Sequence, residues 1–175
     1  MSDAASDGAV VLRTLDLLAR AGIRCDLFGG WAEELLGLRA SGSHGDLDLV
    51  CRASDFVPLD VALPALPEVE EVRAKRFAHK RAFTHLGLLC EILLVQGPSE
   101  APVTVFWNDT PFAWETPLLH PTGCLLKGRR LSVVSAANLL RYRRLHRTTQ
   151  PHRWCETASI VPPLVRPLRA LNGGC

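Results

Sequence analysis

The segment 23–51 constrains the fold of this 175-residue chain more than any other part of the sequence. An apolar run, 23–28, is followed by Gly29-Gly30 and then by a stretch, 31–36, that is typical of a helix opening. After a polar loop, a second run at 46–51 alternates acidic with apolar residues. Alternation with period two indicates a half-buried strand. The segment therefore predicts a strand, a glycine turn, a helix, a loop and a second strand, in that order.

Asp46 and Asp48 are the chemically informative residues of the second strand. Side chains two positions apart on a strand share a face, so both carboxylates are predicted to project together while Leu47 faces a core. Two adjacent carboxylates repel each other unless a proton or a cation lies between them. Because Mg²⁺ takes oxygen ligands and commonly accompanies substrate phosphates, the pair predicts a magnesium site.

Gly29 and Gly30 are expected to supply the other half of such a site. Glycine lets the backbone approach a phosphate closely, and a helix N-terminus offers free N–H groups and a favourable dipole. An ordinary tight turn would also explain a glycine pair. The combination with two aspartates on the following strand favours the phosphate site.

These residues resemble the nucleotidyltransferase superfamily, in particular the small lincosamide and aminoglycoside nucleotidyltransferases. The resemblance is carried by Gly29-Gly30-Trp31, by Leu35-Leu36-Gly37 and by the run from His44 to Leu49. It covers 23–51, extends more loosely to about residue 95 and fades in the last third. It implies an α+β fold, with a mixed β-sheet and flanking helices. It also implies Mg²⁺-dependent transfer of a nucleoside monophosphate from a nucleoside triphosphate to a hydroxyl.

The resemblance further implies a third carboxylate on a neighbouring strand, for which Glu91 is the candidate. Glu91 lies in the apolar run 88–95, which predicts a buried central strand. A carboxylate there is costly unless it is paired or bound to metal. Glu91 would either join Asp46 and Asp48 as a metal ligand or accept the proton of the acceptor hydroxyl. The alternative is an edge strand with Glu91 facing water.

The loop before Asp46 departs from the family pattern. Relatives often carry an arginine two residues before the histidine, where this chain has Gly42, and their third acid is often aspartate. Arg39, in the same loop, is a candidate to reach the site instead. His44 is expected either to touch a phosphate and orient Asp46, or to bond to backbone as an ordinary loop histidine.

Two further sets of residues have competing interpretations. Lys80, which precedes a strand opposite Glu91, is a candidate phosphate ligand, although Lys80 and Arg81 could form a solvated pair. Trp107 and Trp114 either line an acceptor pocket or belong to the core. A basic stretch interleaved with aromatic residues either binds RNA or turns its arginines to water. This stretch comprises Arg141, Tyr142, Arg143, Arg144, His146, Arg147, His152, Arg153 and Trp154.

Length and composition predict one domain over 1–156, with a catalytic core at about 7–97 and a loose tail at 157–175. Hydrophobic residues make up 47% of the chain, which excludes a fully disordered protein. Residues 1–119 carry 17 acids and 10 bases, whereas 120–175 carry one acid and 10 bases. The two parts have net charges of −7 and +9, so they are expected either to neutralise each other or to face different ligands.

The six cysteines contain no Cys-x-x-Cys pair, which argues against a zinc site. Cys25, Cys51 and Cys90 fall in apolar runs, where cysteine acts as a small hydrophobe. With no signal peptide and no apolar run of about 20 residues, a cytoplasmic protein is expected.

Periodicity and turn residues predict the remaining elements. These are a helix from Ser6 or Asp7 to Gly22, a helix from Ser54 or Asp55, a strand at 69–72, a hairpin of 82–86 and 89–95, a strand at 103–107, a hairpin over 125–134 turning at Lys127-Gly128, and a helix from Ser135 to about Arg147.

The sequence as a whole predicts a nucleotidyltransferase that modifies a small hydroxylated molecule, with antibiotics as a candidate class. A polyanionic acceptor is disfavoured because the site lies in the acidic part of the chain. Two alternatives remain: a nucleotide-binding module without catalysis, and a nucleotidyltransferase acting on RNA or on a protein hydroxyl.

Overall fold

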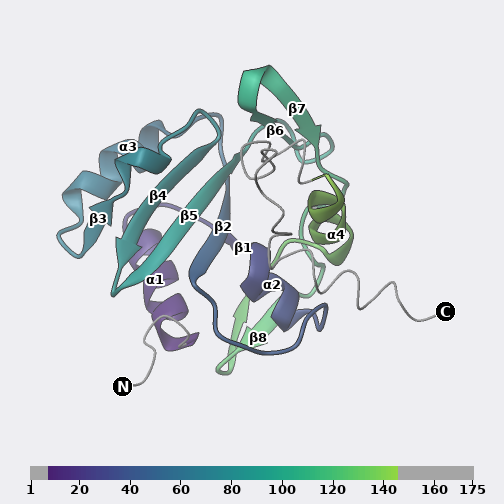
Figure 1. Ribbon diagram of the computed structural model, residues 1–175, viewed down its shortest axis with the longest axis horizontal. Helices are drawn as coiled ribbons and strands as arrows, with labels where there is room; N and C mark the ends of the chain where they lie inside the picture. The colour runs from purple at the N-terminus through teal and green to yellow at the C-terminus, as the bar shows by residue number, and fades with distance from the viewer. Residues whose placement is uncertain (1–7, 146–175) are drawn as a thin grey trace, which may run out of the picture.

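A computed structural model describes residues 8–145 of the chain. Its centre is a mixed five-stranded sheet with strand order β1-β2-β5-β4-β3 (Figure 1). The strands are β1 (Asp26–Leu27), β2 (Asp46–Arg52), β3 (Val69–Glu71), β4 (Lys80–His85) and β5 (Leu88–Val95). Strands β2 and β5 run parallel, and the other neighbouring pairs run antiparallel. The predicted α+β class with a mixed sheet is confirmed.

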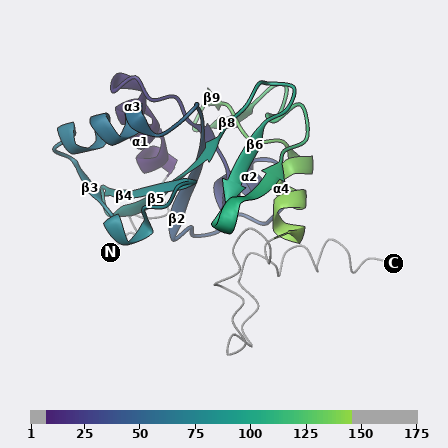
Figure 2. The same ribbon diagram turned by 90° about the horizontal axis from the view of Figure 1, so that it is seen from above.

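Helices and two small hairpins surround this sheet. The helices are α1 (Gly8–Arg20), α2 (Gly29–Leu35), α3 (Val57–Ala62) and α4 (Ala136–Arg144). The hairpins are β6 (Val103–Phe106) with β7 (Thr110–Ala113), and β8 (Cys124–Leu126) with β9 (Arg129–Leu131). Single 3₁₀ turns lie at Leu63–Ala65, Arg73–Lys75 and Trp107–Asp109. Helices α1 and α3 lie on one face of the sheet, as the view from above shows (Figure 2).

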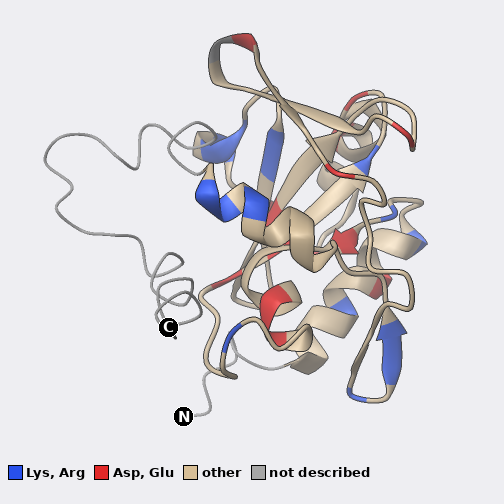
Figure 3. Cartoon of the chain, turned by 90° about the vertical axis from the view of Figure 1, so that its right-hand side faces the viewer, with Lys and Arg blue, Asp and Glu red and all other residues tan. Residues whose placement is uncertain are grey.

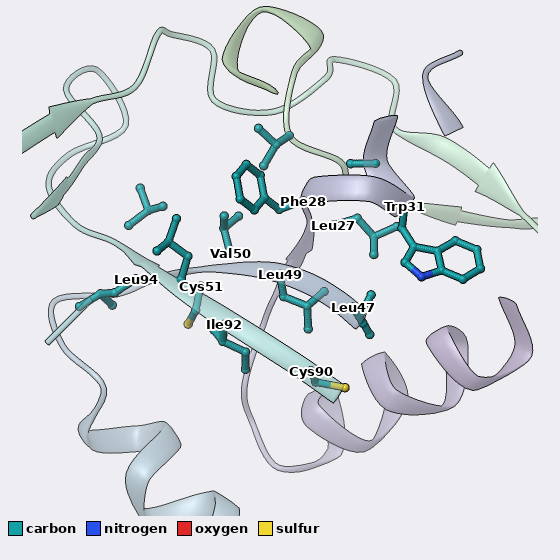
Figure 4. Close-up of a cluster of buried hydrophobic side chains, with 14 of the residues drawn as sticks. Leu27, Phe28, Trp31, Leu47, Leu49, Val50, Cys51, Cys90, Ile92 and Leu94 are labelled. Atoms are coloured by element: carbon teal, nitrogen blue, oxygen red, sulfur yellow. The ribbon is translucent and has the colours of Figure 1, made fainter. Parts of the chain in front are cut away.

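The core forms between the sheet and α1 because the strands alternate. Leu47, Leu49 and Cys51 of β2 project to the same side as Cys90 and Ile92 of β5 (Figure 4). Both leucines are fully buried, and burial of a leucine side chain stabilises a fold by about 1.5–3 kcal/mol. The intervening residues of both strands face the other side of the sheet, where Asp46, Asp48 and Glu91 lie beside the buried apolar Val50 and Leu93.

The last third of the chain closes the β1 side of the sheet. Leu27 donates its N–H to Ser132 O at 2.9 Å, and Val134 donates to Leu27 O at 2.9 Å. The backbone groups of β1 that do not pair with β2 are thereby satisfied. A segment far along the chain therefore holds the strand that leads into Gly29.

A buried ion pair joins α4 to α2. Arg143 donates to the Glu33 carboxylate, and the two side chains are 5% and 4% exposed. Burial lowers the pKa of Arg143 to about 10, which leaves the guanidinium charged at neutral pH. Because α2 begins at Gly29, this pair helps to fix the helix that follows the glycine turn.

Most predicted elements are present, with shifted ends. The predicted helix at 135–147 is described through Arg144, and Ser135 caps it by accepting a hydrogen bond from the Asn138 N–H. The hairpin turn at Lys127-Gly128 is confirmed, with positive φ at both residues. Strand β7 was missed because Pro111 within the run argues against a strand.

The predicted tail at 157–175 lies outside the described residues. Within the described part of the chain, no helix is both long enough and apolar enough to cross a membrane.

We predict that Arg143→Ala destabilises the fold by about 3–5 kcal/mol, because it leaves the Glu33 charge buried without its partner. Urea unfolding would measure this loss. The matched control is Arg144→Ala, which removes an exposed arginine from the same helix and should change stability by no more than about 0.5 kcal/mol. Equal effects of the two substitutions would contradict a structural role for the buried pair.

His85 gives the fold a pH dependence. Its Nδ1 lies 2.8 Å from Thr14 Oγ1 of α1 in a buried contact. Burial lowers the pKa of His85; Glu68 opposes this shift, whereas Arg13 and Arg20 add to it. The unfolded chain therefore binds a proton first as pH falls below about 6.5, so stability drops there. We expect His85→Gln to show a shallower loss of unfolding free energy between neutral and mildly acidic pH. Identical pH profiles would contradict this assignment.

Candidate active site

The parallel pairing of β2 with β5 brings three acids to one face of the sheet. In the register of the two strands, Asp48 lies directly opposite Glu91, and Asp46 lies opposite Leu89. Asp46 and Asp48 are half-buried, and Glu91 is 7% exposed. This face is opposite to the one that packs on α1, since Leu47 and Leu49 point the other way. Residues 43 positions apart are thus neighbours in the sheet, and the edge-strand alternative for Glu91 is wrong.

Gly29 lies against the Asp48 carboxylate. Its φ is +61°, in the left-handed region, and a Cβ added there would overlap Asp48 Oδ2 and lie 2.8 Å from Cγ. In addition, Phe28 donates its N–H to Asp48 O at 3.0 Å. Only glycine allows both the backbone conformation and this close approach. The glycine turn and the acidic strand therefore form one site.

Arg39 and His44 both reach Gly30. A Cβ added to Gly30 would lie 2.8 Å from His44 Nδ1 and 3.0 Å from Arg39 Nη1. The loop that lacks the expected arginine at Gly42 thus brings another arginine to the glycine pair. Arg39 therefore places a cation at the start of α2. The sequence had indicated Arg39 as a candidate to reach the site in place of the missing arginine.

Glu34 anchors His44, a contact that sequence reasoning missed. His44 Nε2 lies 2.8 Å from Glu34 Oε2, and Gly42 donates its N–H to the same oxygen at 3.1 Å. Burial alone would raise the pKa of Glu34, but the hydrogen bonds from His44 and Gly42 outweigh it and lower the pKa. The His44 ring packs on Trp31 at 4.4 Å between centroids. One alternative from the sequence was that His44 bonds to backbone as an ordinary loop histidine. In the structure its partner is the Glu34 side chain instead.

Two lysines hold Glu91. Lys80 Nζ donates to Glu91 Oε2 at 2.9 Å, and Lys75 donates to Glu91 Oε1. Burial acts to raise the pKa of Glu91, but the ammonium groups of Lys80 and Lys75 dominate and lower it. The carboxylate is therefore ionised at neutral pH. Lys75, from a charged run with no distinctive pattern, was not identified from the sequence.

The alternative in which Lys80 and Arg81 form a solvated pair is wrong. Lys80 faces Glu91, and Arg81 faces the other side of β4, where its Nε donates to Asp60 Oδ1 at 2.6 Å. The alternation of the strand separates the two cations, so only Lys80 belongs to the acidic face.

The donor set fits a magnesium ion through Asp46 and Asp48. Mg²⁺ is commonly held by one or two carboxylates together with substrate phosphates and waters, and this strand pair offers two oxygen donors beside the Gly29 turn. Glu91 fits less well as a third ligand, because each of its oxygens accepts a hydrogen bond from a lysine. No group of three or more His, Cys, Asp or Glu side chains in residues 8–145 is arranged to hold a metal.

Two of the three described arginines of the basic stretch, Arg141 and Arg143, make internal contacts, and Arg144 is exposed. Arg143 pairs with Glu33, and Arg141 lies 4.6 Å over the Phe112 ring while donating to Ala113 O. Basic segments of this helix are marked in Figure 3, where Lys and Arg are blue. The expectation that all these arginines turn to water is therefore wrong for Arg143. The stretch beyond Leu145 lies outside the described residues.

The two tryptophans have different surroundings. Trp114 is 4% exposed and stacks on Tyr142 at 5.9 Å, so it belongs to the core. Trp107 lines a cavity of about 520 Å³ together with Phe77 and His79. This cavity also contains Arg81 and Leu94, whose side chains project to the α1 and α3 side of the sheet. It therefore opens mainly away from Asp48.

This architecture is the nucleotidyltransferase fold. The chain is similar to the lincosamide antibiotic adenylyltransferase LnuA, solved with lincomycin bound, with a TM-score of 0.67 and 12% identity, over 95% of this chain and 97% of that one. It is also similar to ANT(2″)-Ia, solved in complex with adenylyl-2″-tobramycin, with a TM-score of 0.61 and 14% identity, over 84% of this chain and 80% of that one. A scan of protein-family models finds no match, and a search of curated proteins finds none either.

We predict that Gly29→Ala disrupts the site by displacing Asp48. Left-handed backbone costs a non-glycine residue about 1–2 kcal/mol, and the overlap with the Asp48 carboxylate adds to this cost. Urea unfolding of the variant would measure the combined loss. Gly22→Ala separates the two effects, because Gly22 has φ of +78° but nothing within 4 Å of an added Cβ. Equal losses in the two variants would show that the Asp48 contact carries no energy.

Proposed function

We propose that this protein is a nucleotidyltransferase that moves a nucleoside monophosphate from a nucleoside triphosphate to a hydroxyl of a small molecule. The observation that carries the proposal is the union of Asp46, Asp48 and Glu91 on one face, with Gly29 packed against Asp48. The nucleotidyltransferase fold supports it, since the neighbours include adenylyltransferases of antibiotics.

The triphosphate would bind along the glycine turn. Gly29 and Gly30 begin α2, and a helix N-terminus offers backbone N–H groups and a favourable dipole to phosphate oxygens. Arg39 lies at Gly30 and supplies a guanidinium, which suits phosphate oxygens. His44 contacts Glu34 and Trp31 and lies beside Gly30 at this turn. Lys80, and with it Lys75, would contact phosphate oxygens from the Glu91 side.

Asp46 and Asp48 would hold Mg²⁺, which supplies charge neutralisation and orientation of the phosphates. In the transfer, the acceptor hydroxyl oxygen forms a bond to the α-phosphorus, and the bond between this phosphorus and the oxygen leading to the β-phosphate breaks. Pyrophosphate is the leaving group. The hydroxyl proton passes to Glu91, which is ionised and therefore able to accept it.

Phosphate oxygens would compete with Glu91 for the two lysines. Each ammonium group that turns from the carboxylate to the triphosphate leaves Glu91 a stronger base. The arrangement therefore couples nucleotide binding to the readiness of Glu91 to accept a proton.

A small acceptor is favoured over RNA. Residues 1–119, which carry the site, have a net charge of −7, and this disfavours a polyanionic acceptor. Two of the three arginines of α4, Arg143 and Arg141, are engaged with Glu33 and with Phe112, and Arg144 is exposed. Antibiotics are one class of hydroxylated acceptor to test, because LnuA and ANT(2″)-Ia were solved with such molecules.

The test is a screen for Mg²⁺-dependent pyrophosphate release with each nucleoside triphosphate and a panel of hydroxylated antibiotics, RNA and peptides. Turnover on a small molecule supports the proposal, and turnover on RNA alone would favour the RNA alternative. Nucleotide binding with no turnover on any acceptor would favour the binding module.

We predict that Asp48→Asn weakens Mg²⁺-dependent triphosphate binding by about tenfold or more, equivalent to at least about 1.4 kcal/mol. The metal-free protein should keep its stability or gain slightly, because one like-charge repulsion is removed. Calorimetric titration and urea unfolding would measure the two quantities. Glu70→Gln is the matched control, since it removes an exposed acid from β3 at the far edge of the sheet. Unchanged nucleotide binding in Asp48→Asn would refute the metal assignment.

A further inference from the structure

Cys25 directly precedes β1, and the register of β1 with β2, continued by one residue, places it opposite Cys51. The antiparallel register pairs Asp26 with Val50 and Leu27 with Leu49, so the next pair along is Cys25 with Cys51. Phe28 donates its N–H to Asp48 O, which makes that pair a hydrogen-bonded one. Such pairs alternate along an antiparallel ladder, so Cys25 and Cys51 form a non-hydrogen-bonded pair.

This position suits a disulfide. Non-hydrogen-bonded pairs bring the Cα atoms to about 4.5 Å, and disulfides form at Cα separations of about 4.4–6.8 Å. Residues directly opposite each other in an antiparallel pair share a face of the sheet, so both side chains turn to the same side. Neither cysteine is in a disulfide.

The two thiols differ in their chemistry. The Cys25 side chain lowers the pKa of Cys51, against the effect of its burial, while Cys51 and burial raise the pKa of Cys25. This difference favours Cys51 as the attacking sulfur, because the thiolate is the nucleophilic form. Cys51 is 8% exposed and Cys25 is partly exposed.

We propose that Cys25 and Cys51 are a redox modification site, at which hydrogen peroxide converts two thiols into a reversible cross-strand disulfide. The Cys51 sulfur attacks a peroxide oxygen, the O–O bond breaks, and one water leaves, so that Cys51 becomes a sulfenic acid. The Cys25 sulfur then attacks the Cys51 sulfur. The S–S bond forms, the S–O bond breaks, and the departing hydroxide takes the Cys25 proton as the second water. The two sulfurs lose two electrons, which the peroxide gains.

The disulfide would enclose the phosphate side of the candidate active site. The loop that it closes, residues 25–51, contains Gly29, Gly30, His44, Asp46 and Asp48. Oxidation therefore ties the strand that leads into the glycine turn to the strand that carries the aspartates. The cysteine site does not depend on the proposed nucleotidyltransferase activity, because it rests only on the β1–β2 pairing.

Peptide mapping tests the site directly. Trypsin cleaves after Arg24, Arg39 and Arg52, so Cys25 and Cys51 fall in separate peptides, 25–39 and 40–52, each with a single cysteine. The full-length chain, with Cys155 and Cys175 replaced by serine in every sample, would be treated with hydrogen peroxide, alkylated and digested without reduction. We expect a joined peptide lighter by two hydrogen atoms than the sum of its parts, and lost on reduction with dithiothreitol.

Stability provides a second readout. Closing a loop of this length should raise Tm by about 5–10 °C, and dithiothreitol should reverse the rise. Cys124→Ala is the matched control, because this partly buried thiol lies on β8, in a different sheet; it should leave the crosslink and the Tm rise intact. Cys25→Ala should abolish both and leave a Cys51 sulfenic acid that dimedone traps.

Peptide mapping of the protein that keeps both Cys25 and Cys51 tests the proposal even if an alanine variant fails to fold. Peroxide treatment that yields no joined peptide, or that joins Cys51 to Cys90 instead, would overturn the proposal. A Tm rise that persists in Cys25→Ala would overturn it as well.

Discussion

The parallel pairing of β2 with β5 is the contact on which both the core and the candidate site depend. One register places Leu47 and Leu49 beside Cys90 and Ile92 on the core side, and Asp48 beside Glu91 on the other. Because side chains alternate along a strand, a shift of one residue would bury the acids and expose the leucines. The buried apolar residues of the two strands therefore fix the positions of the carboxylates.

Basic side chains neutralise buried or partly buried acids both within the candidate site and elsewhere in the fold. Within the site, Lys75 and Lys80 compensate Glu91. Elsewhere, the basic last third meets the acidic first part in specific pairs: Arg143 with Glu33, and Arg129 with Asp16. The charge asymmetry of the sequence thus serves partly to attach the C-terminal segment, and it is weak support for nucleic-acid binding. This attachment also orders α2, whose first residues form the glycine turn.

The nucleotidyltransferase fold and the residue arrangement support the same chemistry from different directions. The fold is shared with LnuA and ANT(2″)-Ia at 12% and 14% identity, a level at which only the architecture is informative. The Gly29–Asp48 contact and the Asp48–Glu91 pairing belong to this chain and stand without the comparison. The proposed disulfide adds a feature of β1 and β2, on the side of the sheet opposite to Asp46, Asp48 and Glu91.

The sequence alone determined the local elements and the acidic pair. Gly29-Gly30 and the alternation through Asp46 and Asp48 predicted the glycine turn and a shared face, because both follow from backbone geometry over a few residues. It also indicated Glu91, since an acid in an apolar strand demands a partner. Only the tertiary structure decided which partners those are: Lys75 and Lys80 for Glu91, Glu34 for His44, and Arg39 at Gly30. These contacts depend on strand order, register and loop path, which are set by packing across the whole chain and leave no mark in a short stretch of sequence.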